Sequence, residues 1–410
     1  MKHSIRRIAV AGTLVAGLLA TAAPAAHAGT YLNLVGSDTT FFVMDQLARS
    51  YNVSTMNAAG DNDVALNTMP LAAKTNDGET FNKVFPAGNI VPSDAFCSTT
   101  IISTNDVVRG ITGITGITGV RFEAPPNGST AGKTKVLLSG DNGDACYDIG
   151  RSSSAPTTGS ELATTEFWAF ALDATTWIKF PGNVVTSLSI DELRSIYNCQ
   201  VGTGAPTATD WSQVPSAAAA GKSGPIKRYV AQSNSGLGKS FAQLLNGNQN
   251  FLNTNCTGAG LATVTQENDA RAVPTADYAN AIYYYGYGNN YAQGKGVVAD
   301  MRNKSVLGSI TQGGVPVKAG PSTINTLATR FVGTVYRYNL LDTRNPDYRS
   351  ALQFVGAGNI DNDAATPVTN GWLCSNSGMA TIKLYGYIPL KKVVDPATGI
   401  LSYCKKNATL

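Results

Sequence analysis

The sequence is nearly free of histidine. Only two occur among 410 residues, and both, His3 and His27, lie in the first 28. That segment has a basic start, an apolar core from Ile8 to Ala23 and an A-x-A site at Ala26–Ala28, which together are typical of a secretory signal. Once the signal is removed, we expect neither Ser-His-Asp or Cys-His catalysis nor a histidine-ligated metal site.

Long hydrophobic runs are also missing after residue 28. No later stretch is apolar for the roughly 20 residues that a membrane-spanning helix needs. The residue after the predicted cleavage site is Gly29 rather than a cysteine, so no lipid anchor of the bacterial lipoprotein type is expected. We therefore expect a secreted, extracellular protein without a membrane span.

Charge is sparse and balanced. Charged residues make up 14% of the chain, with 31 basic and 27 acidic side chains. The signal holds three of the basic ones, which leaves 28 against 27 in the expected mature chain. Such a chain lacks the basic surface of a nucleic-acid-binding protein. A hydrophobic fraction of 43% is typical of a folded chain rather than a disordered one.

Cysteines are few but even in number, which favours disulfides in a secreted protein. No CxxC spacing suggests a thiolate metal site, and we expect no cofactor. Sequential pairing would keep each bridge within one part of the fold. The expected pairs are Cys97–Cys146, Cys199–Cys256 and Cys374–Cys404.

Strand and helix patterns alternate along most of the chain, which predicts an α/β fold. About 380 residues after the signal exceed what one hydrophobic core usually holds, so we expect two lobes. The range 54–127 has mixed signals and an ITG triplet repeat at 111–119, and it is interpreted as an insertion. Expected strands include 31–35, 165–173, 330–341 and 380–390. A strand followed by a helix start is expected over 279–294, and 349–355 is expected to be helical.

The stretch from Thr186 to Leu245 has the most specific pattern. Ser189 stands three residues before Glu192, the spacing of a capping box, at the start of an amphipathic helix. Further on, a short apolar strand, a Ser/Asn/Gly loop and a second amphipathic helix follow one another. That order leaves backbone N–H groups and hydroxyls free at a helix N-terminus, where an oxyanion can bind.

Four loops rich in serine and threonine stand where strands end or helices begin. Ligands of open α/β sheets bind outside the carboxyl ends of the strands, so these loops are expected to converge. The alternative is that each serine or threonine is only a helix N-cap. The loops are Asp38–Phe41, Gly128–Gly132, Arg151–Ser154 and Ser233–Gly236.

The four loops resemble segments of the phosphate-binding proteins of ABC transporters. The order of three further segments is also similar to that family: Leu193–Ile196, then Asp210-Trp211-Ser212, then Ser235-Gly236-Leu237. The resemblance implies a two-lobed, type II periplasmic-binding-protein-like fold with a hinge and a central cleft. The signal would occupy 1–28. Lobe 1 would comprise 29–170 and 330–410, including the insertion 54–127, and lobe 2 would comprise 171–329.

The resemblance also implies the function. Phosphate or a related oxyanion would bind between the lobes of a monomeric solute-binding protein, with an ABC permease as partner and no enzymatic activity. Hydroxyls and backbone amides of the four loops would hold the anion. The residues at the matching positions are Thr40, Phe41, Ser129, Thr130, Ser153, Ser154, Ser235 and Gly236.

Three positions depart from the family pattern. The family has a proton-accepting aspartate at a position that matches Ser153 or Ser154 here. The position of the family's arginine is occupied by Ala231, and that of the threonine in its Ser-Gly-Thr loop by Leu237. The candidates to replace the arginine, each otherwise expected to be a solvated surface charge, are Arg151, Lys227, Arg228 and Lys239. These departures keep two alternatives open. One is a protein that kept the fold but binds another phosphorylated ligand, a surface polymer or a protein; the other, less favoured, is an enzyme such as a phosphatase.

Overall fold

A computed structural model describes most of the chain after residue 30. The described residues are 31–44, 46–47, 119–122, 128–143, 147–156, 162–201, 206–249, 260–326, 330–346, 348–358, 369–391, 393–394 and 401–408. The predicted signal, the ITG repeat up to residue 118, Cys97, Cys146 and Cys256 lie outside them, and so do most residues of the range 54–127.

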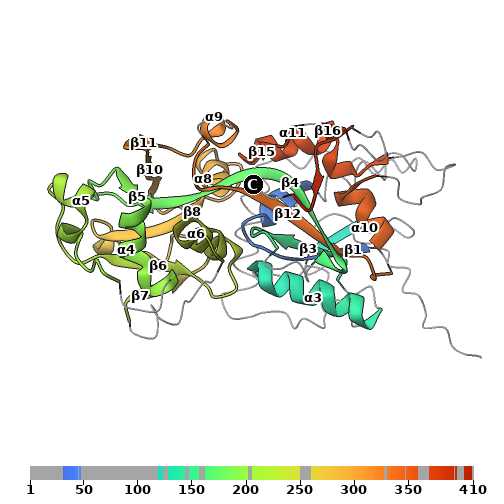
Figure 1. The fold of residues 1–410 in the computed structure, drawn as a ribbon, viewed down its shortest axis with the longest axis horizontal. Helices are drawn as coiled ribbons and strands as arrows, with labels where there is room; N and C mark the ends of the chain where they lie inside the picture. The colour runs from blue at the N-terminus through green and yellow to red at the C-terminus, as the bar shows by residue number, and fades with distance from the viewer. Residues whose placement is uncertain are drawn as a thin grey trace, which may run out of the picture.

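One large mixed sheet organises the molecule, with helices packed against it (Figure 1). Its main path runs in the order β2-β1-β3-β12-β4-β8-β6-β7. The α/β class predicted from the sequence is confirmed. The strands on this path are β1 (Tyr31–Gly36), β2 (Gly119–Phe122), β3 (Ile149–Ser152), β4 (Thr165–Lys179), β6 (Lys227–Ala231), β7 (Ala262–Thr265), β8 (Ala281–Gly286) and β12 (Thr334–Asp342).

The two ends of the sheet are parallel, and two long antiparallel strands connect them. Strand β1 pairs in parallel with β2 and β3, and β6 pairs in parallel with β7 and β8. We call β1–β3 with helix α3 (Gly128–Asn142) the first half. The second half is β6–β8 with α4 (Ile190–Val201) and α6 (Gly236–Asn246). Strand β2 lies within the range interpreted as an insertion, yet it belongs to the main sheet. The predicted lobe boundaries stay a prediction.

Strand β4 crosses from one half to the other. Its run of apolar residues is buried on both faces, as expected for a central strand. Nine of its first ten residues pair with β12 and its last five with β8. The register with β12 shifts between Arg337 and Tyr338, so a β-bulge interrupts the ladder at this point. A bulge changes the direction of neighbouring side chains. Arg337, beside this bulge, lies at the candidate site described below.

The second half confirms the predicted local patterns. The Ser189 hydroxyl accepts a hydrogen bond from the N–H of Glu192 at 3.1 Å, and the Glu192 carboxylate accepts the N–H of Ser189 at 2.7 Å. Ser235 caps helix α6, since its Oγ accepts the N–H of Gly238 at 2.9 Å. Asp210 likewise caps the short helix η4 (Trp211–Gln213). The tyrosines at 283–285 are fully buried.

Smaller elements complete the described part. A three-stranded sheet is formed by β5 (Ser187–Ser189), β10 (Ser309–Gln312) and β11 (Val315–Val317). The remaining helices are α5 (Pro215–Ala219), η5 (Thr275–Asp277), α8 (Tyr287–Gly294), α9 (Pro321–Ile324), α10 (Tyr348–Val355), η6 (Trp372–Cys374) and α11 (Asn376–Leu384). The remaining strands are β9 (Val306–Leu307), β13 (Ala357–Gly358), β14 (Thr369–Asn370), β15 (Ile388–Pro389), β16 (Val393–Val394), β17 (Leu401–Ser402) and β18 (Lys405–Lys406).

The strand predicted over 380–390 is wrong for most of its length. Ser375 caps a helix there, α11, which runs to Leu384, and only β15 is extended. Gly386, with φ of +81°, turns the chain between the two elements. An apolar run of this length fits a helix as well as a strand, and here the N-cap decided between them.

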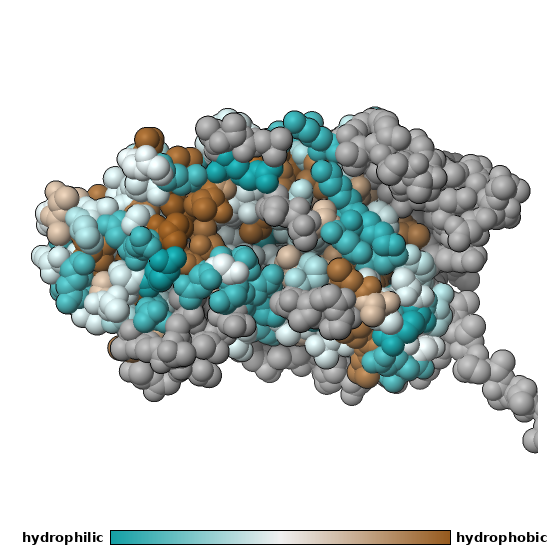
Figure 2. Space-filling model, viewed as in Figure 1, coloured by the Kyte–Doolittle hydropathy of each residue, from teal (hydrophilic) through white to brown (hydrophobic). Residues whose placement is uncertain are grey.

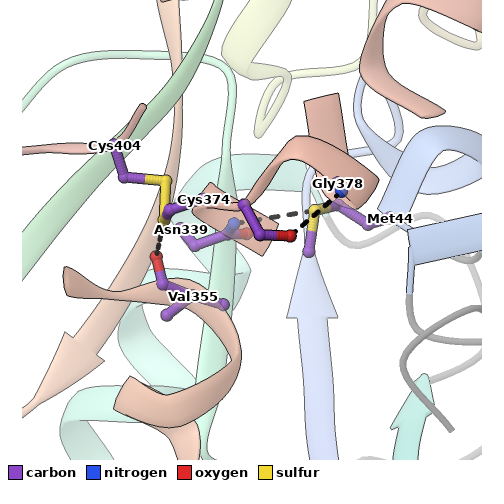
Figure 3. Close-up of a disulfide and its surroundings, with 7 residues drawn as sticks. Met44, Asn339, Val355, Cys374, Gly378 and Cys404 are labelled. Carbon is purple, nitrogen blue, oxygen red and sulfur yellow. Dashed lines mark hydrogen bonds between the residues drawn. A yellow bond between two sulfur atoms is a disulfide. The ribbon is translucent and has the colours of Figure 1, made fainter. Parts of the chain in front are cut away.

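A disulfide between Cys374 and Cys404 connects η6 to the segment before β18 (Figure 3). Its Cα atoms are 5.2 Å apart, and the pair is the one predicted. Cys199 is disulfide-bonded as well, to a partner outside the described residues. The predicted pairs Cys97–Cys146 and Cys199–Cys256 therefore stay predictions.

Figure 2 shows one face of the molecule, on which groups of hydrophobic residues lie among hydrophilic ones in both halves of the view. Apolar atoms contribute more than half of the accessible surface of most folded proteins, so such exposure is normal. Among the described helices, none is both long and apolar enough to cross a bilayer.

Candidate functional site: an oxyanion-binding donor ring

Four loops meet where the parallel strands end. Strand β1 ends at Gly36, β3 at Ser152, β6 at Ala231 and β7 at Thr265, and each is followed by polar residues. Two of the strands belong to the first half and two to the second. The predicted loops after β1, β3 and β6 converge as expected, and Ser129 of the fourth predicted loop contacts Ser153, whereas the loop after β7 was not among the predicted ones.

The centre of the convergence is the carboxylate of Glu267, which follows β7. Its Oε1 accepts the backbone N–H of Thr39 at 2.8 Å and the Thr39 hydroxyl at 2.7 Å, with the Ser37 hydroxyl further away at 3.5 Å. Its Oε2 accepts the Ser235 hydroxyl and, at 3.4 Å, the N–H of Leu237. We call these five donors the donor ring. Each half contributes to it, and Glu267 itself is 3% exposed.

The donor ring is neutral. It consists of hydroxyls and backbone amides, and two of its members belong to the N-cap and first turn of α6. The partial positive charge of a helix N-terminus favours an anion at this place. Within the described residues, neither an arginine nor a lysine pairs with Glu267. The ring therefore stabilises the carboxylate of Glu267 by dipoles rather than by counter-charge.

A serine cluster connects the ring to the first half. Ser153 lies at the end of β3, and its Oγ accepts the Ser37 hydroxyl at 2.9 Å. The Ser129 hydroxyl lies 3.2 Å from Ser153 Oγ and accepts the N–H of Ser153 at 2.9 Å. Across the interface, the Ser240 hydroxyl of α6 donates to the carbonyl of Ser153 at 2.6 Å. These contacts hold α6 directly against the first half.

Gly236, the first residue of α6, lies at the closest approach of the two halves. A Cβ at this position would lie 2.0 Å from Ser129 Oγ and 2.2 Å from Ser153 Oγ. Gly128 is equally close to the loop of the second half, since a Cβ added at Gly128 would lie 2.2 Å from the carbonyl oxygen of Asn234. Only a residue without a side chain fits either position.

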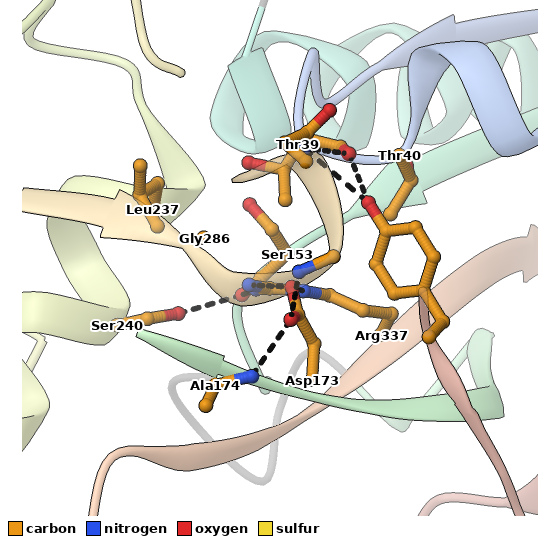
Figure 4. A network of polar contacts seen from close by, with 12 residues as sticks. Thr39, Thr40, Ser153, Asp173, Ala174, Leu237, Ser240, Gly286 and Arg337 are labelled. Carbon is orange, nitrogen blue, oxygen red and sulfur yellow. Dashed lines mark hydrogen bonds and ion pairs between the residues drawn. The ribbon is translucent and has the colours of Figure 1, made fainter. Parts of the chain in front are cut away.

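Below the ring lies a buried ion pair (Figure 4). Arg337 of β12 donates to Oδ2 of Asp173 through Nε at 2.8 Å and Nη2 at 2.6 Å, and both side chains are fully buried. Its Nη1 donates to the carbonyl of Ser153 at 2.7 Å. The other carboxylate oxygen of Asp173 accepts the N–H groups of Ala174 and Gly288. The pair thus joins β4, β12 and the serine cluster.

Asp38 is a second carboxylate at the site. Its Oδ2 accepts the side-chain amides of Gln232, at 2.9 Å, and of Gln266. Burial raises the pKa of Asp38 well above its usual range, the neighbouring Glu267 adds to the rise, and Arg151 opposes it. Arg151 donates to the carbonyls of Ser37 and Gly36 rather than to Glu267.

The structure distributes the predicted site residues over different roles. Ser235 is in the donor ring, Ser129 and Ser153 form the serine cluster, and Gly236 marks the closest approach. Thr40 donates only a long 3.5 Å bond to the carbonyl of Ser37, and Phe41 packs beneath the Arg151 guanidinium. Thr130 and Ser154 have no described contact with the donor ring; Ser154 instead contacts Ser152. Whether any of these residues binds a ligand stays a prediction.

The sequence-based predictions did not include several residues at the centre of the candidate site. Ser37, Thr39, Glu267 and Arg337 were not singled out, although Thr39 stands next to the predicted Thr40. The expectation that Arg151 and Arg228 are surface charges is wrong, because both are buried. Arg228 lies away from the site, where it donates to the carbonyls of Ile196 and Ala208. Lys227 is exposed, and Lys239 is half-buried on α6.

Comparison with known proteins gives similarities in structure only. No family model matches the chain, and no curated protein matches it. Several solved structures of phosphate receptors are similar to it. A phosphate transport receptor from Vibrio cholerae is 16% identical at a TM-score of 0.46, with 87% of this chain and 99% of that one covered. A substrate-binding protein of a putative phosphate transporter from Clostridium perfringens, with bound phosphate, is 14% identical at 0.48, covering 88% and 100%.

A possible phosphate-binding protein from Planctomyces limnophilus is 16% identical at a TM-score of 0.42, covering 87% of this chain and 92% of that one. All three belong to the class of protein that the sequence motifs resemble. At these identities, the chemistry of this chain has to be inferred from its own contacts. Among the described residues, no group of three His, Cys, Asp or Glu side chains is placed to hold a metal ion.

Proposed function

We propose that this protein is a solute-binding protein that holds phosphate or a related oxyanion in the donor ring. The observation that supports the proposal is the convergence of five neutral donors, from both halves, on one anionic group. Hydroxyls and amides fixed in this way bind a tetrahedral oxyanion as readily as a carboxylate.

The arrangement of strands supports the same function. The ring forms where the loop after β1 meets those after β6 and β7, while β4 and β12 lie between the halves. Bending of such connecting strands opens and closes two-lobed binding proteins. Export from the cell and delivery to an ABC permease belong to the same proposal.

Calorimetric titration tests it. We expect one phosphate per chain with a Kd of about 1 µM, which corresponds to roughly −8 kcal/mol. Thr39→Ala removes one hydroxyl of the ring and should weaken binding about tenfold or more. Thr326→Ala is the matched control, because Thr326 is exposed and lies outside the site. No heat and no thermal shift with phosphate or sulfate, in the wild type and in a Glu267→Ala variant, would reject the function.

A second function has one observation in its favour. Glu267 already fills the donor ring, as expected of a chain that kept the fold but binds something else, such as another phosphorylated ligand, a surface polymer or a protein. In that case Thr39→Ala would leave the biological function intact. No described arrangement favours an enzyme.

A further inference from the structure

We infer that Glu267 is the resident anion of the donor ring, and that an external oxyanion binds only by displacing its carboxylate. The inference rests on the proposed function and deepens it, because it names the group with which phosphate competes. It starts from the contacts of the ring, in which four of the five donors, from Thr39, Ser235 and Leu237, are directed at the two oxygens of Glu267, while the Ser37 hydroxyl is closer to Ser153 than to Glu267.

The loop that carries Glu267 is built to hold it there. The N–H of Glu267 donates to Gln232 Oε1 at 3.0 Å. Asn268 adopts a left-handed conformation, with φ of 58°, that side chains seldom take outside fixed turns. Its side chain accepts the N–H of Gly286 at 2.8 Å and donates to Thr39 Oγ1 at 3.1 Å.

Three buried side chains fix the same loop from β8 and α8. The carbonyl of Asn268 accepts hydrogen bonds from the hydroxyl of Tyr285 and, at 3.0 Å, from the amide of Gln293. The carbonyl of Gln266 accepts the hydroxyl of Tyr283 at 2.9 Å. Glu267 thus stands on a backbone with buried partners on both sides, so its position in the ring belongs to the fold.

A carboxylate and a phosphate cannot share these donors. Two like charges a few ångströms apart repel strongly in a buried site. A tethered carboxylate competes at an effective concentration of millimolar or more, so it weakens the apparent affinity for any external anion. Removing it should therefore tighten binding of phosphate.

The carboxylate also closes the molecule. It connects Thr39 of the first half to Ser235 of the second, and the same contacts are those a bound anion would make. Without an external ligand, Glu267 satisfies the buried donors that would otherwise be unpaired. The closed arrangement is therefore compatible with an empty binding protein.

The experiment compares wild type, Glu267→Ala and Glu267→Gln by phosphate calorimetry and by thermal unfolding without ligand. We expect phosphate Kd at least about tenfold lower for Glu267→Ala than for wild type, with Glu267→Gln in between, because its amide retains part of the contacts. Glu166→Ala is the matched control, since Glu166 is also buried but lies at the far end of β4, bonded to Trp168 and Lys406. It should leave the phosphate Kd unchanged.

The outcomes separate the inference from the proposed function. Equal phosphate affinity in wild type and both Glu267 variants would overturn the inference and leave the function standing. If no protein binds phosphate or sulfate, the function fails, and ligand-free unfolding decides the inference. A melting temperature lowered by at least a few degrees in Glu267→Ala would support Glu267 as the resident anion, and an unchanged one would overturn it. Glu267→Gln provides the same test should the alanine variant fold poorly.

Discussion

Two buried carboxylates at the junction of the halves, Asp173 and Glu267, are stabilised in opposite ways. Asp173 has a full counter-charge in Arg337 and two backbone amides besides. Glu267 has only hydroxyls and amides among its described partners. Asp173 stands on β4, within the sheet, and Glu267 stands on a loop. A carboxylate with its own arginine is part of the frame, whereas one held by neutral donors occupies a place that another anion can take.

The comparison predicts the largest effect for the ion pair. Arg337→Met leaves the carboxylate of Asp173 buried without its counter-charge, and we expect a loss of about 3–5 kcal/mol in the free energy of unfolding. Urea denaturation measures it. Arg302→Met is the control, because the Arg302–Asp300 pair is partly exposed and worth about 1 kcal/mol or less.

A double variant sharpens this result. Asp173→Asn removes the charge but keeps one carbonyl oxygen as an acceptor, so Asp173→Asn/Arg337→Met should recover part of the loss. If the double variant is as unstable as the sum of the two single ones, charge is not what the pair contributes to stability.

A smaller effect is expected at the ring. Ser235→Ala removes the cap of α6 and the hydroxyl that Glu267 accepts, at a cost of about 2 kcal/mol in unfolding free energy. Ser375→Ala removes the cap of α11, outside the ring, and should cost about 1 kcal/mol. In a Glu267→Ala background the excess of Ser235→Ala over Ser375→Ala should disappear. If the excess persists, the loss of stability in Ser235→Ala comes from the helix cap alone and not from the contact with Glu267.

The smallest effect concerns pH. Asp38 keeps its proton in the folded state to a pH well above its usual pKa of 3.8. The fold therefore binds this proton more tightly than the unfolded chain, and its stability falls as pH rises from about 4 through the raised pKa. Asp38→Asn cannot ionise, so its unfolding free energy relative to wild type should increase over that range.

Chemical denaturation at successive pH values from 4 to 8 measures the difference, with other titrating groups cancelling between the two proteins. Asp191→Asn serves as the control, because the side chain of Asp191 is exposed. A difference between Asp38→Asn and wild type that stays constant with pH would contradict the prediction.

Local patterns account for what the sequence predicted well. The Ser189–Glu192 capping box, the cap at Ser235 and strand β4 each depend on residues close together in the chain, where spacing and burial pattern determine the structure. Convergence of the four loops followed from a general property of parallel strands.

The centre of the site could not be predicted in the same way. Glu267 lies in a short polar stretch without a motif, and its partner Thr39 is 228 positions away. Arg337 lies inside a strand pattern, and its partner Asp173 stands on another strand, 164 positions away. Both roles arise only when the two halves are brought together.

The bare backbone at Gly236 has a mechanical consequence. There is no room for even one carbon between α6 and the serines of the first half, so the present distance between the halves requires glycine at this position. The contact at Gly236 therefore limits how closely α6 can approach the first half. A single added methyl group at this position would act as a wedge and bias the molecule towards an open form, whichever anion the donor ring prefers.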